Sequence, residues 1–177
     1  LVHDYEACWM TELDGQTYDF HYTRLLLDFY KAVRMNGGSL DIVGKNADFT
    51  GYKLVIIPSF VHFQEEDLQR VIKSGAKILA GPRTGTKTPD FQLPPELSLE
   101  GLGFQVRRVD ALPKDLPVPV EWNGIKGSFS VWREHGLTSG VSEGKSSDGM
   151  VVLTRGNQGS YLCGWPDQKL LNAIMKN

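Results

Sequence analysis

The sequence predicts an α/β fold: a three-layer sandwich with a mostly parallel sheet, helices on both faces and antiparallel strands added in the C-terminal half. Lys53–Pro58 is a continuous run rich in Val and Ile, which is typical of a strand buried on both faces. Gln64–Ser74 carries apolar residues at helical spacing and is followed by Gly75, a helix stop. Lys77–Ala80 is a second short apolar strand. These residues predict a right-handed β-α-β unit.

The residues before this unit predict one helix and two strands. Leu1–Tyr5 has the composition of a first strand, and Leu40–Val43 of another. Asp14-Gly15 is a turn signal. Asp19–Met35 has an apolar face at helical spacing, and glycines at 37 and 38 end it.

The residues after Gly85 are less regular and predict loops and antiparallel or edge strands. In order they are a proline-containing loop at Thr86–Pro95, a short helical turn at Glu96–Gly103, a strand at Phe104–Val109, a proline-rich connection at Leu112–Pro119, a weakly alternating stretch at Glu121–Trp132, a Ser/Gly-rich loop at Val141–Gly149, a hairpin formed by Met150–Thr154 and Ser160–Cys163, and a closing helix at Asp167–Met175.

Length and composition favour a single domain that comprises residues 1–177. The formal net charge of −2 gives no reason to expect a nucleic-acid partner. The apolar runs are too short for a membrane helix, which needs about 20 residues. Two cysteines far apart in sequence predict a reducing compartment, hence a cytoplasmic location. Because the chain starts at Leu1, already strand-like, we expect it to be part of a longer protein.

Chemistry in a parallel sheet is expected beyond the carboxyl ends of the strands, which singles out Ser59, Arg83 and Thr84 as possible interface or ligand contacts. A nucleophile is absent from the turn Gly81–Gly85. Cys8 and Cys163 are better interpreted as small, buried hydrophobic residues than as catalytic nucleophiles. The residues therefore predict no catalytic site.

No metal or cofactor is predicted either. His3, His21, His62 and His135 lack the spacing of metal ligands, and His62 is interpreted as a loop or surface histidine. Asp4 and Glu6 alternate along the expected first strand, so they should point to opposite faces and not act together.

Two interpretations of Arg83 remain open. Arg83, Thr84 and the glycine that follows could form an anion cradle. Alternatively, Arg83 pairs with a carboxylate, either Asp4 or Glu6 or one on a partner subunit, and this is favoured. Trp9 is placed at an edge that faces a partner, because interfaces use Trp as an anchor.

Several motifs, taken in order, resemble the trimerisation domain of family 42 glycoside hydrolases, the bacterial β-galactosidases. They are DYEACW at 4–9, YKLVIIPS at 52–59, GAKILAGPRTG at 75–85, LPPELSLEGLGFQVRRVDAL at 93–112 and MVVLTRGNQGSYLCG at 150–164. The sequence departs from the family at Gln158, and Lys114–Asp148 follows no family pattern.

The resemblance implies a flavodoxin-like fold, related to class I glutamine amidotransferases but without their catalytic Cys. It implies that the catalytic glutamates lie in a preceding TIM barrel of a galactoside-hydrolysing parent enzyme. This domain would then pack its own barrel and neighbouring subunits into a homotrimer and help wall the neighbouring active site.

Two alternative functions, each of a different class from an assembly domain, stay open. One is an amidotransferase-like hydrolase that uses Cys8 or Cys163. The other is a small-ligand or sugar-binding module that uses Ser59, Arg83 and Thr84.

Overall fold

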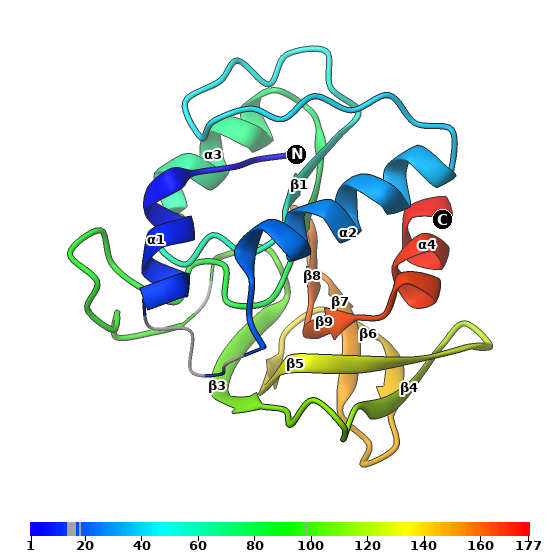
Figure 1. Cartoon of the computed structure of the whole chain (residues 1–177). Helices are drawn as coiled ribbons and strands as arrows, with labels where there is room; N and C mark the ends of the chain where they lie inside the picture. The colour runs from blue at the N-terminus through cyan, green and yellow to red at the C-terminus, as the bar shows by residue number, and fades with distance from the viewer. Residues whose placement is uncertain (14–16, 18, 98) are drawn as a thin grey trace.

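A nine-stranded sheet organises the chain (Figure 1). The structure is a computed structural model that describes residues 1–13, 17, 19–97 and 99–177. In Figure 1 the four labelled helices lie in the upper part of the view and β3–β6 in the lower part. The elements in chain order are α1 (Tyr5–Leu13), α2 (Tyr22–Met35), β1 (Leu54–Ile57), α3 (Glu65–Lys73), β2 (Lys77–Ala80), β3 (Phe104–Ala111), β4 (Val118–Trp122), β5 (Ile125–Thr138), β6 (Val141–Ser146), β7 (Val151–Arg155), β8 (Ser160–Leu162), β9 (Gly164–Pro166) and α4 (Gln168–Lys176).

The predicted strand–helix–strand unit is confirmed as β1-α3-β2. Strands β1 and β2 pair in parallel, and both are buried after their first residue. Gln64 is the N-cap residue of helix α3, and its backbone N–H donates to the Asp67 carboxylate at 3.1 Å. It ends before Gly75, whose φ of 79° is the left-handed conformation expected after a helix. Local sequence signals therefore determine this unit.

The sheet is mixed and mostly antiparallel, so the prediction of a mostly parallel sheet is wrong. Its order is β1-β2-β8-β7-β6-β4-β5-β3, with β9 paired to β5. Of the named pairings, only β1–β2 and β2–β8 are parallel. The later strands follow one another through short turns, and a short turn can join only antiparallel neighbours. The predicted hairpin is confirmed as β7–β8.

Four local predictions fail. Residues 1–5 form one isolated parallel bridge, Val2 to Val43, and helix α1 begins at Tyr5 instead of a strand ending there. The expected strand at 40–43 contributes only that bridge. The expected loop at 141–149 contains strand β6, which is held between β4 and β7. The described part of 96–103 contains no helix, and the Asp14-Gly15 turn lies outside the described residues.

Helices α2 and α4 pack against each other. Helix α2 buries Leu25 and Phe29, as its predicted apolar face requires. Asp167 caps the start of helix α4, where its carboxylate accepts the Leu170 N–H at 2.8 Å. Among the described residues, no helix is both long and apolar enough to cross a membrane.

Candidate functional site

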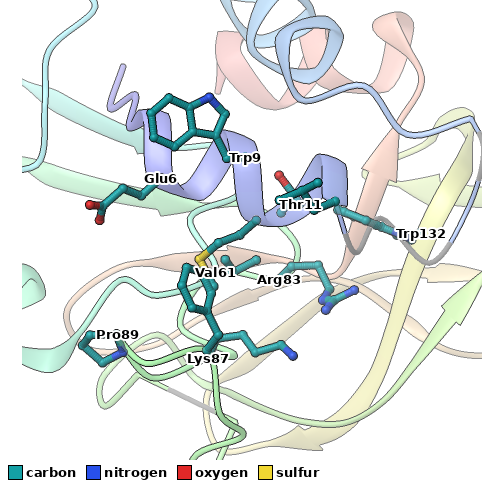
Figure 2. A pocket seen from close by; sticks show the side chains of 11 residues that line it. Glu6, Trp9, Thr11, Val61, Arg83, Lys87, Pro89 and Trp132 are labelled. Atoms are coloured by element: carbon teal, nitrogen blue, oxygen red, sulfur yellow. The ribbon is translucent and has the colours of Figure 1, made fainter.

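A cavity of about 590 Å³ lies between helix α1 and the turn that follows β2. Figure 2 shows α1 along one side of it, with Arg83 and Trp132 towards one end and Glu6 towards the other. Its lining residues are Glu6, Trp9, Met10, Thr11, Leu13, Val61, Arg83, Lys87, Pro89, Phe91 and Trp132. Three of the six residues singled out from the sequence, Glu6, Trp9 and Arg83, therefore meet at one cavity.

The turn after β2 is fixed to the end of β1. A Cβ on residue 81 would lie 1.9 Å from the Pro58 carbonyl oxygen, so only Gly fits there. The Thr84 hydroxyl donates to the Ile57 carbonyl and accepts the Phe60 N–H, both at 3.3 Å. Thr84 is thus a buried residue that joins two segments and does not line the cavity.

Ser59 is fully buried beside this turn. Its Oγ has no hydrogen-bond partner among the described residues, and it does not line the cavity. Ser59 and Thr84 therefore lie beneath the surface where the sequence had placed a contact site.

Arg83 lies at the inner end of the cavity and is only 6% exposed. Its φ of 70° is the left-handed conformation that non-glycine residues seldom adopt. Its backbone N–H donates to Glu134 Oε1 at 3.0 Å. Its guanidinium carbon lies 5.0 Å from the ring centroid of Trp132, within cation–π range.

The carboxylate that accepts the Arg83 backbone N–H is Glu134, whereas the sequence had offered Asp4, Glu6 or a carboxylate on a partner subunit as the pair of Arg83. Glu134 projects from β5 and is 2% exposed. Its Oε2 accepts the Tyr161 hydroxyl at 2.8 Å. Burial raises the pKa of Glu134 to about 7, although the Tyr161 hydrogen bond and the Arg83 charge oppose this. Sequence reasoning missed Glu134, because β5 lies in the stretch that followed no pattern.

Asp4, Glu6 and His62 form a second cluster at the start of α1. Asp4 Oδ1 accepts the Ala7 N–H at 3.0 Å, as an N-cap residue does. His62 Nε2 lies 3.6 Å from both Asp4 Oδ1 and Glu6 Oε2. The prediction that the two carboxylates point apart is wrong, because α1 is a helix here and not a strand.

His62 is buried, contrary to its interpretation as a loop or surface histidine. It is 3% exposed and lies in the segment between β1 and α3. Burial lowers the pKa of His62 and outweighs the attraction of Asp4, and the nearby Lys45 lowers it further. The burial of His62 thus favours the neutral form of its imidazole.

The two cysteines are poorly placed for catalysis. Burial raises the pKa of Cys163 well above its ordinary value, with a further contribution from Glu134. Burial, followed by the Glu12 charge, also raises the pKa of Cys8. A nucleophilic cysteine needs a lowered pKa, so both thiols weigh against a hydrolase that depends on them.

The outer side of the cavity is apolar and exposed. We call Trp9, Leu13 and Phe91 the outer wall, and Arg83 with Trp132 the inner wall. The exposed fractions of Trp9 and Leu13 are 61% and 89%, and half of Phe91 is exposed. Tyr5, also exposed, lies one helical turn before Trp9, so α1 presents an apolar stripe to solvent.

Comparison with known proteins gives a consistent result. A family model described as the β-galactosidase trimerisation domain matches residues 1–168. The β-galactosidase BgaA of a Thermus species is 34% identical over 179 residues, which cover 99% of this chain and 28% of that protein. The β-galactosidase BgaH of Haloferax lucentense is 30% identical over 191 residues, which cover 99% of this chain and 29% of that protein.

Solved structures agree. The crystal structure of a β-galactosidase from the psychrophilic Marinomonas ef1 matches with a TM-score of 0.90 and 32% identity, over 98% of this chain and 27% of that one. A polyextremophilic β-galactosidase from the Antarctic haloarchaeon Halorubrum lacusprofundi matches with a TM-score of 0.86 and 28% identity, over 98% of this chain and 28% of that one. The chain spans about 28% of the length of the curated relatives named above.

Proposed function

We infer that this chain joins subunits of a β-galactosidase-type glycoside hydrolase into a homotrimer and supplies no catalytic residue itself. The reason is that the chain belongs to the family of β-galactosidase trimerisation domains. In this proposal the parent protein is a longer, cytoplasmic enzyme. A TIM barrel before this domain carries the catalytic glutamates, and galactosides are its substrates. The domain packs against its own barrel and helps wall the active site of a neighbour.

The exposed outer wall is the observation that best supports this assembly role. Soluble monomers rarely expose contiguous large apolar groups, and such patches usually mark contact surfaces. Trp9 and Phe91 are aromatic residues at the rim of a cavity, a typical setting for an interface anchor. A cyclic trimer requires two different patches on each subunit. We assign the outer wall to one of them, with a neighbouring subunit as its occupant.

Buried polar residues weigh against the sugar-binding alternative. Ser59 and Thr84 do not reach the cavity, and the Arg83 backbone N–H is already engaged with Glu134. Sugar sites instead need several polar groups aimed at the ligand.

The flavodoxin-like, amidotransferase-like relation is also a proposal. Its support is the parallel set β1, β2 and β8, together with the β1-α3-β2 crossover. The antiparallel strands β3–β7 would then be an addition to that core.

Light scattering of the full-length protein tests the assembly role. Trp9→Glu places a charge in the outer wall, and we expect it to raise the dissociation constant of the trimer at least about tenfold. The matched control is Leu116→Glu, since Leu116 is similarly exposed but lies in the turn before β4. Trimers of unchanged stability in Trp9→Glu, or equal weakening in both variants, would remove the outer wall from the interface.

A further inference from the structure

Asp4, Glu6 and His62 come together from two segments that tertiary packing brings into contact. Asp4 and Glu6 lie at the start of α1, and His62 lies between β1 and α3. One ligand-type atom from each residue lies within 4.8 Å of the other two. This is a chemically mixed set of one imidazole nitrogen and two carboxylate oxygens.

Hydrogen bonding does not explain the arrangement. The two separations of 3.6 Å from His62 Nε2 exceed the range of an N–H···O hydrogen bond. Neither ring nitrogen of His62 has a hydrogen-bond partner among the described residues, although the side chain is 3% exposed. A buried polar group without a partner is costly, so a histidine aimed at two carboxylates needs a further ligand to complete it.

The two separations from His62 Nε2 match those of atoms that share one metal ion. Zinc binds imidazole nitrogen and carboxylate oxygen at about 2.0–2.2 Å. Tetrahedral geometry at those bond lengths puts neighbouring ligand atoms about 3.3–3.6 Å apart. The observed 3.6 Å between His62 Nε2 and each carboxylate lies at the upper end of that range.

We propose that Asp4, Glu6 and His62 bind a divalent transition-metal ion, with Zn²⁺ as the best match. Neutral imidazole with carboxylates is a donor set that suits borderline cations. Asp4 Oδ1 already accepts the Ala7 N–H, but a carboxylate oxygen has a further lone pair for the ion. The Glu6 side chain is 67% exposed, so the ion has a path from solvent and an open position for water.

The ion would have a structural effect at the cavity. It would fix the first turn of α1 to the segment before α3, and Glu6 is also a lining residue of the cavity. The outer wall begins only three residues later, at Trp9. The proposal does not depend on the assembly role, because its test measures binding to a single chain.

The direct test is titration of the tag-free, chelator-treated chain with Zn²⁺ alone and with Co²⁺ alone. We expect one ion per chain by calorimetry, and a Co²⁺ visible spectrum without thiolate charge-transfer bands. Glu6→Gln should weaken binding at least about tenfold, and His62→Gln should abolish it. The matched control Glu66→Gln, an exposed carboxylate in the first turn of α3, should bind like the parent chain.

Other results would overturn the proposal. They are the absence of one-to-one binding, equal affinities in Glu6→Gln and Glu66→Gln, or thiolate bands that assign the ion to a cysteine. Circular dichroism checks the fold of each variant. Because Glu6 is exposed, Glu6→Gln decides the question even where His62→Gln fails to fold.

Discussion

The two walls of the cavity are built on opposite principles. The inner wall is polar and buried: Arg83 lies over Trp132, and its backbone N–H donates to a buried Glu134. The outer wall is apolar and exposed, with Trp9 and Leu13 on a helix near the N-terminus. The outer wall thus exposes apolar groups and the inner wall buries a charged one, each against the usual distribution.

The contrast separates two kinds of unusual residue. A buried polar residue that hydrogen-bonds other buried groups holds the fold, because removing one partner leaves the others unpaired in the interior. An exposed apolar residue costs the isolated chain little and becomes useful when something covers it. We therefore expect substitutions in the inner wall to change stability, and substitutions in the outer wall to change association.

The largest effect is expected from Glu134→Ala. The change removes the acceptor of the Arg83 N–H and of the Tyr161 hydroxyl, and both donors lie in the interior. We expect the free energy of unfolding to fall by about 3–5 kcal/mol, measured by urea denaturation. Glu134→Gln is the conservative control. It keeps the shape and one acceptor, so at about pH 5, where the raised pKa keeps Glu134 protonated and neutral, it should stay within about 1 kcal/mol of the parent. Equal losses in the two variants would contradict a role for these hydrogen bonds.

The next effect is a pH dependence from the same residue. Burial holds the pKa of Glu134 at about 7 in the folded chain, against an ordinary value of 4.5. Between these two pKa values, Glu134 is ionised in the unfolded chain but still protonated in the folded chain. The free energy of unfolding therefore falls as pH rises, and the loss is complete above about pH 7. We expect a loss on the order of 3 kcal/mol across this interval.

Subtracting the Glu134→Gln profile isolates this contribution from that of other titrating groups. Urea denaturation at about pH 5, 6, 7 and 8 gives both curves. A difference between them that stays flat, or that grows more favourable to the parent as pH rises, would contradict a raised pKa.

The smallest effect on stability is expected in the outer wall. Leu13 is 89% exposed, so Leu13→Ser should change the free energy of unfolding by less than about 0.5 kcal/mol. Leu25→Ser, at a fully buried leucine of α2, should cost at least about 3 kcal/mol in the same urea titration. If the Leu13 variant proves as unstable as the Leu25 variant, the outer wall supports the fold itself, and the contrast between the walls fails.

How far the sequence predicted the fold depended on whether the signals were local. The unit β1-α3-β2 was predicted because its apolar runs and glycine stops lie within the segment. Strand β6 was missed because its Ser- and Gly-rich residues are extended only through pairing with β4 and β7. Helix α1 was missed because the composition of Leu1–Tyr5 suggested a strand there, although Asp4 offered an N-cap signal that the structure uses.

The candidate site was predicted in part for the same reason. Glu6, Trp9 and Arg83 were singled out and do line one cavity. Whether Trp9 contacts a partner remains a prediction. Glu134 and His62 gain their roles from segments distant in sequence: Arg83 lies 51 residues from Glu134. No spacing rule within one element could reveal those pairs.

The distribution of tryptophans gives the molecule an optical reporter. Trp122, Trp132 and Trp165 are buried, whereas Trp9, the fourth tryptophan of the chain, is largely exposed. An aqueous quencher such as iodide should therefore reach the indole of Trp9 while the other three remain shielded. Fluorescence that is quenched in the separated chain and protected in the assembled protein would follow subunit docking in real time, without any added dye.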